Sequence, residues 1–136
     1  MKIGKIVIAT VVITVFNAIV GAVACGGIFN WVYKLEPVSV WKPMEAPGIL
    51  YYIGAILLDF IFVVIYALLH TGIPGKNKLI KGLVFGLCVW GIGTLPGMFA
   101  TYIFMTVAPT VIIYWTIMAL VLAPLKGLMT AAIYGE

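Results

Sequence analysis

The stretch GILYYIGAILLDFIFVVIYALLHT, residues 48–71, is apolar over the length of a membrane span and carries one formal charge, Asp59, at its middle. No other formally charged residue lies near the centre of a hydrophobic segment of this chain. A carboxylate in hydrocarbon is costly, and it is usually hydrogen-bonded, protonated or engaged with an ion. The stretch therefore indicates a membrane protein with one polar focus, although it does not name a substrate.

The composition of the whole chain agrees with a membrane location. Its 136 residues are 65% hydrophobic and 9% charged, with a mean hydropathy of +1.25. Because a soluble domain carries roughly a quarter charged residues, this inventory cannot build a surface that faces water. The bilayer must be the solvent for most of the molecule.

Four hydrophobic segments are each long enough to cross about 30 Å of hydrocarbon as a helix. They cover residues 6–29, 48–71, 79–107 and 109–134, and together they predict one all-α domain, residues 1–136, built as an up-down bundle of four transmembrane helices. Gly72 and Pro74 end the second segment, and Asn77 is a suitable N-cap for the third. Pro109 opens the fourth after a short turn, which predicts a tight helical hairpin.

The basic residues predict the orientation of the bundle. All eight are lysines, which against four acidic residues give a net charge of +4, and six of them lie near the chain ends or around the loop between the second and third segments. Lysine-rich ends stay in the cytoplasm, so we expect an inner (plasma) membrane protein with both termini cytoplasmic. Lysines at helix ends do not indicate nucleic-acid binding, and the lack of arginine argues against a dedicated anion site.

The segment of residues 30–47 is the only sizeable loop, and we expect it outside the cell. Tryptophan and tyrosine favour the headgroup region of a bilayer, so this loop should lie along the membrane surface. A lid over a cavity and a docking surface for a partner are the functional alternatives. Its aromatic, proline and acidic residues are Trp31, Tyr33, Trp41, Pro37, Pro43, Glu36 and Glu45.

Helical spacing arranges the polar residues of the second segment on one stripe. Steps of seven, seven and four residues join Tyr52, Asp59, Tyr66 and His70, and at about 100° per residue all four share one face. Such a line suits a proton or cation route, and it equally suits a helix face buried against its neighbours. We expect His70 to bind carbonyls at the helix end, with a proton-relay or headgroup role as the alternative.

Other segments offer hydrogen-bonding partners for this stripe. Asn17 lies near the middle of the first segment, on a face that also carries Thr10, Thr14 and Gly21, and Thr94 lies in the third. We expect Asn17, Thr94, Tyr52 and Tyr66 to line a site around Asp59. Lys126 is expected near the cytoplasmic boundary, which leaves Asp59 without an intramembrane lysine.

Three interpretations of Asp59 remain open. It can be a static hydrogen-bonded link between helices, a proton- or cation-binding site in a transport cycle, or a partner for another subunit or cofactor. Interhelical hydrogen bonds contribute only about 0.6–2 kcal/mol in membranes. Asparagine or serine would meet a purely structural need more cheaply, which favours a function.

The sequence GIGTLPG, residues 91–97, is the clearest conformational signal. Pro96 removes a backbone hydrogen bond and clashes with the preceding turn, so we predict a kink in the third helix. Gly93 and Gly97 make that bend easier and expose carbonyls near mid-membrane, as in the broken helices of some transporters. A kink that only shapes packing is the alternative.

The remaining residue types argue against metal, cofactor and catalytic sites. Cys25 and Cys88 form no CxxC pair, His70 is the only histidine, and Ser39 is the only serine. No hydrolytic triad, HExxH motif or phosphate-binding loop is present. We therefore expect neither a cofactor nor a metal, and enzymatic activity ranks below the other hypotheses.

The leading hypothesis is a small polytopic protein that transports or conducts a proton, cation or small solute through a site centred on Asp59. The alternative is an accessory or assembly subunit of a larger membrane complex. Small residues recur at four-residue spacing, as in Ala18, Ala22 and Gly26, and such faces let helices approach closely. Because four helices enclose little space, we expect homo-oligomers or other membrane subunits as partners in the lipid bilayer.

Overall fold

The computed structural model describes residues 1–42 and 48–135 and is all-α over these ranges. Four spans make up the bundle, in agreement with the predicted fold class. The first is α1 (Ile3–Val23) with a π-helical extension, η1 (Ala24–Ile28), and the second is α2 (Ile49–Leu69). The third joins α3 (Lys78–Val89), the π-helical η4 (Trp90–Thr94) and α4 (Leu95–Phe104), and the fourth is α5 (Pro109–Tyr134).

The ends of these helices follow the signals in the sequence. The Asn77 side chain accepts a hydrogen bond of 3.0 Å from the backbone N–H of Ile80, so it is the N-cap of α3. Pro109 occupies the first turn of α5, where its missing N–H costs nothing. Only four residues, 105–108, separate α4 from α5, and the two helices form the expected hairpin.

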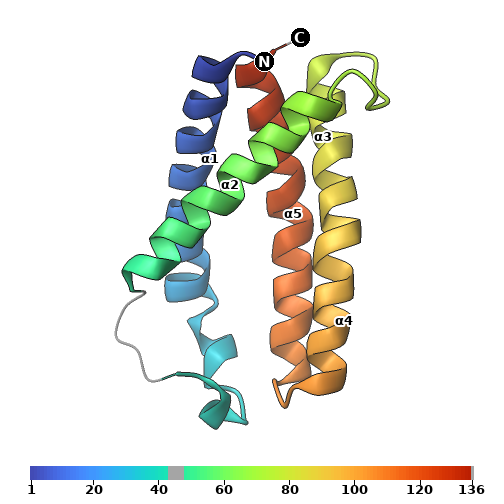
Figure 1. The fold of residues 1–136 in the computed structure, drawn as a ribbon. Helices are drawn as coiled ribbons and strands as arrows, with labels where there is room; N and C mark the ends of the chain where they lie inside the picture. Colours follow the sequence, from blue (N-terminus) through green and yellow to red (C-terminus); the bar gives the residue numbers. More distant parts are fainter. Residues whose placement is uncertain (43–47, 136) are drawn as a thin grey trace.

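The chain runs up and down through the bundle, so both termini lie at one end (Figure 1). We call this the terminal end and the opposite one, which carries residues 29–42, the loop end. Helices α1 and α5 stand roughly upright, and α3 and α4 continue as one column beside α5. Helix α2 instead crosses the bundle diagonally, close to α3 at the terminal end and far from α4 at the loop end (Figure 1).

Glycine brings α3 and α5 into backbone contact. Gly82 and Gly86 of α3 face Gly127, Ala123 and Pro124 of α5, and a methyl group added at Gly127 would overlap the Gly82 carbonyl oxygen. In lipid, close packing replaces the hydrophobic effect as the force between helices. The small residues of α3 are thus used inside the chain, and α3 and α5 are its most tightly packed pair.

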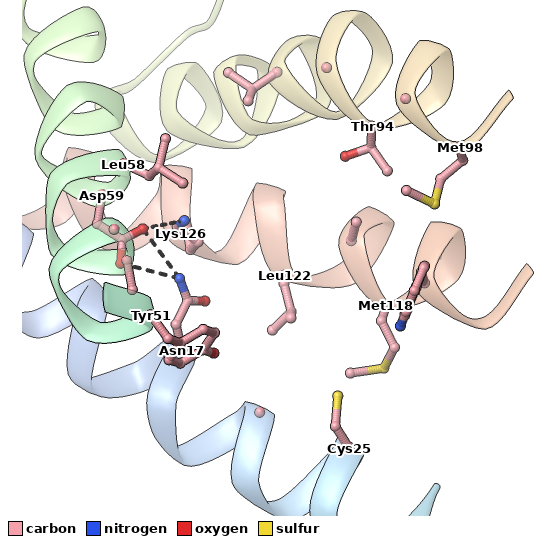
Figure 2. Close-up of a pocket in the computed structure, with 18 of the residues that line it drawn as sticks. Asn17, Cys25, Tyr51, Leu58, Asp59, Thr94, Met98, Met118, Leu122 and Lys126 are labelled. Carbon is pink, nitrogen blue, oxygen red and sulfur yellow. Dashed lines mark hydrogen bonds and ion pairs between the residues drawn. The ribbon is translucent and has the colours of Figure 1, made fainter. Parts of the chain in front are cut away.

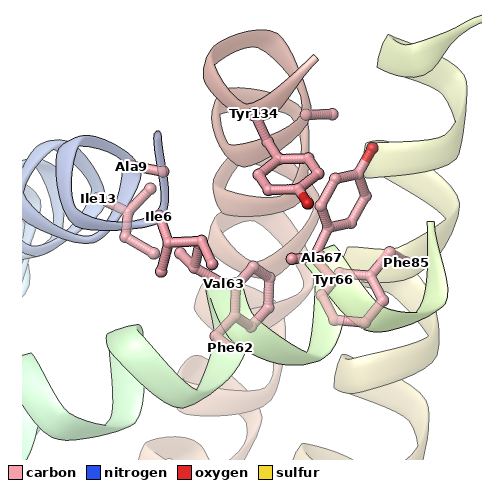
Figure 3. Close-up of a cluster of buried hydrophobic side chains, with 10 residues drawn as sticks. Ile6, Ala9, Ile13, Phe62, Val63, Tyr66, Ala67, Phe85 and Tyr134 are labelled. Atoms are coloured by element: carbon pink, nitrogen blue, oxygen red, sulfur yellow. The ribbon is translucent and has the colours of Figure 1, made fainter. Parts of the chain in front are cut away.

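The buried core lies toward the terminal end and joins all four spans. Figure 3 shows Ile6, Ala9 and Ile13 of α1 facing Phe62, Val63 and Tyr66 of α2, with Phe85 of α3 and Tyr134 of α5 beside them. The rings of Phe62 and Phe85 are 4.9 Å apart, and those of Tyr66 and Phe85 are 5.4 Å apart. These contacts pack the four spans together in the terminal half of the bundle.

A second, smaller core holds the described part of the loop against α5. Val32 is buried there, and the Trp115 indole N–H donates a hydrogen bond of 2.8 Å to the Tyr33 hydroxyl. The Trp41 ring packs edge-on against both Tyr33 and Trp115, and burial raises the pKa of Tyr33 to about 12. Pro43 and Glu45 of the predicted loop lie outside the described residues.

The third span deviates from α-helical geometry one turn before Pro96. The π-helical segment η4 precedes α4, and the Leu95 N–H bonds to the Trp90 carbonyl, five residues back. A π-bulge inserts one residue into a helix and occurs often at functional sites. The irregularity predicted around Pro96 is therefore a wider helical turn, and α3 and α4 still run on as one column (Figure 1).

The glycine contact makes a prediction about stability. Gly127→Ala forces α3 and α5 apart, and overpacking of this kind typically costs about 1–3 kcal/mol in unfolding free energy. Gly91→Ala is the matched control, because a methyl group there meets nothing within 4 Å. Circular dichroism during titration of folded micelles with sodium dodecyl sulfate compares the two variants. Equal midpoints would contradict the close packing of α3 on α5.

Candidate functional site

Asp59 lies at the centre of α2 and is only 2% exposed. Lys126 of α5 forms an ion pair with it, with Nζ 2.5 Å from Oδ1. From α1, the Thr14 hydroxyl donates a hydrogen bond of 3.0 Å to Oδ2, and the Asn17 amide donates to both oxygens at 3.2 and 3.3 Å. Three helices thus meet at one carboxylate (Figure 2).

The expectation that Asp59 has no intramembrane lysine is wrong. At 1.5 Å per residue, Asp59 lies about 15 Å from the end of α2 and Lys126 about 12 Å from the end of α5, so the two helix positions differ little in depth. The long, flexible lysine stem closes the remaining gap. Figure 2 shows Asp59 of α2 and Lys126 of α5 pointing toward each other.

The two partners of the ion pair differ in accessibility. The Asp59 side chain is 3% exposed, whereas that of Lys126 is 18% exposed. The Lys126 ammonium also lies 5.0 Å from the centre of the Phe62 ring, within the range of a cation–π interaction. The carboxylate is therefore enclosed by hydrogen-bond donors, while the ammonium keeps one side open.

That open side faces a cavity of about 850 Å³ between the four spans. The cavity begins near Leu50 in the first turn of α2 and reaches Asp59, about 14 Å along the helix axis. Figure 2 shows the ion pair at one end of this space, with Leu122 beside it and Thr94, Met98, Met118 and Cys25 around the rest. Apart from the charged end, the walls are predominantly apolar.

The predicted stripe on α2 does not form one continuous polar path. Tyr66 is 1% exposed and belongs to the core of the terminal half, while His70 packs edge-on against Tyr134 at 5.3 Å. His70 Nδ1 also lies 2.9 Å from the Ala67 carbonyl oxygen, at the helix end where a carbonyl partner was expected. These two residues close the terminal end, and neither lines the cavity.

Tyr52 also lies away from the cavity. It is 48% exposed, and its neighbour Tyr51 lines the cavity instead. Because α2 crosses the bundle at a steep angle, a stripe that faces inward at the crossing faces outward near the helix end (Figure 1). The stripe therefore positions Asp59 correctly but does not place Tyr52 in the site.

The third span contributes one wall of the cavity. Thr94, Gly93 and Gly97 line it, whereas Pro96 is exposed on the other side of the helix and does not. Added methyl groups at Gly93 and Gly97 would meet nothing within 4 Å. The glycines thus leave room in the cavity, and the π-helical turn before Pro96 sets the direction in which Thr94 points.

Sequence reasoning missed several cavity residues. Lys126 is the most important, and comparing its depth with that of Asp59 would have revealed it. Cys25 and Tyr114 meet near the loop end, with Sγ and Oη 3.4 Å apart, but nothing in their spacing marks them as neighbours. Within the described residues, no three His, Cys, Asp or Glu side chains are grouped to hold a metal ion.

Known proteins offer no guide to this site. Comparisons of the chain with protein-family models, with curated protein sequences and with solved structures find no match. What the fold establishes is a small multi-pass membrane protein with four spans and a charged pair at the inner end of a cavity.

Proposed function

We propose that this protein transports or conducts a proton, cation or small solute, and that the Asp59–Lys126 pair is the site at which it is bound. The observation that carries the proposal is the position of the pair at the closed end of an 850 Å³ cavity. A cavity of this size holds a small molecule. A buried charge pair that served only stability would need no such access.

The energetics of the pair support a working role. Transfer of two charges out of water costs several kcal/mol per ion, so apolar replacements of a buried pair are often as stable or more so. A proton added to Asp59 would cancel its attraction for Lys126 and leave the ammonium available to another partner. The pair would then have two arrangements, which a transport step requires.

The two halves of the bundle support access from one side at a time. The cavity reaches the pair from the loop end, while Tyr66, Phe85 and Tyr134 close the terminal end. From the distribution of lysines, we place the termini in the cytoplasm of a plasma-membrane protein, which turns the cavity outward. A transport cycle would then require the terminal core to open, with the glycine-rich η4 region as the flexible element.

A role as a subunit has one observation in its favour. Ala18, Ala22 and Gly26 are exposed on α1 and η1, and a methyl group at Gly26 would meet nothing within 4 Å. Such small-residue faces accept a second helix in membranes. A homo-oligomer or a larger complex would use this face, and neither excludes transport through the cavity.

Flux through purified protein tests the proposal directly. Wild-type protein in proteoliposomes that contain a pH-sensitive dye should acidify the vesicle interior faster than protein-free vesicles do. Asp59→Asn should reduce the acidification rate to that of protein-free vesicles, because the titratable group is gone. Glu36→Gln is the matched control, since Glu36 is an exposed carboxylate in the loop. Dye fluorescence under an imposed pH gradient, with and without a small test solute in the outer medium, reports the rate. Equal flux in wild type and Asp59→Asn would remove Asp59 from the route.

The stability of variants of Asp59 and Lys126 distinguishes a transport role of the pair from a purely structural role. Lys126→Met leaves a buried carboxylate without its partner and should lower the unfolding free energy by about 3–5 kcal/mol. The double variant Asp59→Asn/Lys126→Met should recover most of that loss, as measured by detergent titration, yet carry no flux. If the double variant were stable and fully active, the pair would be a structural link only.

The two cysteines report whether the cavity contains water. Cys25 lines the cavity, whereas Cys88 is exposed on the lipid-facing side of α3. A thiol reacts as its thiolate, which forms in water and not in hydrocarbon. A membrane-impermeant maleimide should therefore label Cys25 in intact cells and leave Cys88 unmodified, as read by mass spectrometry against Cys25→Ala. Protection of both thiols would contradict an open, outward-facing cavity.

A further inference from the structure

The charged end of the cavity presents a cation to an incoming ligand. Both Asp59 oxygens are occupied by Lys126, Thr14 and Asn17. An ammonium group has three N–H donors, and within the described residues that of Lys126 contacts one carboxylate and one ring face. The group at this end that can still form a hydrogen bond is therefore the Lys126 ammonium, a positively charged donor.

The site has a low dielectric constant, so its net charge must stay close to zero when a ligand binds. A carboxylate bound to Lys126 would bring the net charge of the pair to minus one, which is costly in hydrocarbon. One proton taken up by Asp59 restores neutrality, because the site then holds a neutral Asp59 acid and an ion pair between Lys126 and the ligand carboxylate. The only covalent change in this exchange is a proton transfer: an O–H bond of a hydronium ion from the medium breaks, an O–H bond forms on the Asp59 carboxylate, and neutral water is released.

We propose that the cavity binds a monocarboxylate with an apolar body, and that each carboxylate binds together with one proton, the carboxylate on Lys126 and the proton on Asp59. This inference rests on the proposed function and names the class of its small solute. A lysine acts as a point charge for anions and does not require the planar geometry of arginine. The absence of arginine, which in the sequence argued against a dedicated anion site, therefore does not exclude a single carboxylate bound to Lys126. A dianionic phosphate would leave its second charge uncompensated.

The surroundings of Asp59 suit both of its protonation states. Among the residues that the structure describes, the charged group in contact with it is Lys126 of α5, and its contacts from α1 come from Thr14 and Asn17, neither of which titrates. A threonine hydroxyl both donates and accepts, so Thr14 can rotate and accept the new O–H of Asp59. Asn17 continues to donate to the other oxygen. Protonation therefore releases Lys126 without leaving the acid unpartnered.

The opposite ligand charge fits less well. An alkylammonium would compete with Lys126 for the single carboxylate of Asp59, which would leave two cations and one anion at the site. The uncharged walls then select for the ligand body, because Leu58, Val89, Met98, Met118 and Leu122 line the space beyond the pair. An apolar chain that extends from Lys126 toward the loop end would bury its methylenes against these side chains.

Calorimetric titration of the full chain in lipid nanodiscs tests this proposal with hexanoate, octanoate and octylammonium as probes. Wild-type protein should bind octanoate about 15-fold more tightly than hexanoate, since octanoate has two more methylenes and each buried methylene contributes about 0.8 kcal/mol. Titrations near neutral pH in two buffers of different ionisation enthalpy should show one proton taken up per octanoate. Protein-free nanodiscs provide the background from partitioning into lipid.

Variants assign the two roles. Lys126→Met should weaken octanoate binding about 10- to 100-fold, which corresponds to the loss of a hydrogen bond to a charged group. Asp59→Asn should keep or improve binding but abolish proton uptake, because asparagine does not titrate. The double variant Asp59→Asn/Lys126→Met, whose site is neutral, should not bind octanoate even though it folds. Lys76→Met, in an exposed loop, is the matched control and should behave as wild type.

The outcomes separate this inference from the proposed function. Equal octanoate binding by wild type and Lys126→Met would overturn the carboxylate assignment, and so would octanoate binding without proton uptake in wild type. Saturable binding of octylammonium that Asp59→Asn abolishes would also overturn it, while leaving cation transport through Asp59 intact. Flux that does not depend on Asp59 would instead overturn the proposed function itself.

Discussion

The ion pair between Asp59 and Lys126 determines how the rest of this small bundle is arranged. Each charge requires the other, because a lone ion at this depth would cost several kcal/mol. Thr14 and Asn17 then bind the carboxylate from α1, so the polar contacts join three of the four spans. The fourth partner, α3, is held to α5 by glycine contacts instead. Polar contacts therefore join α1, α2 and α5, and close packing joins α3 to α5.

This arrangement separates a closed half from an open half. Toward the terminal end, aromatic and aliphatic side chains fill the space between the spans. Toward the loop end, α2 diverges from α4, and small residues such as Gly93, Gly97 and Gly54 leave a cavity. The charged pair lies at the border between the halves, where one face of Lys126 meets the cavity while the carboxylate stays enclosed.

Much of this could be predicted from sequence, and the limits have a clear physical origin. Hydropathy finds the four spans because lipid requires long apolar helices, and Asp59 is evident as the charge at the middle of one. Helical periodicity also places Asn17 correctly, since it depends on one straight helix. It fails for Tyr52, which the tilt of α2 turns outward, and for Tyr66, which faces inward but is buried in the terminal core and does not line the cavity. Lys126 was missed because its stem extends toward the centre rather than the nearer surface.

The backbone contact between α3 and α5 limits how this protein can change shape. Where two helices touch through glycine, neither can slide or rotate without a collision between main-chain atoms, so Gly82, Gly86 and Gly127 join them into a single stiff column. Helices α1 and α2 meet that column through side chains, as in the Asp59–Lys126 pair and the ring contact between Phe62 and Phe85. A rearrangement that exposes the pair to the other side would therefore keep α3 and α5 together, and would instead move α2 or bend the third span at η4.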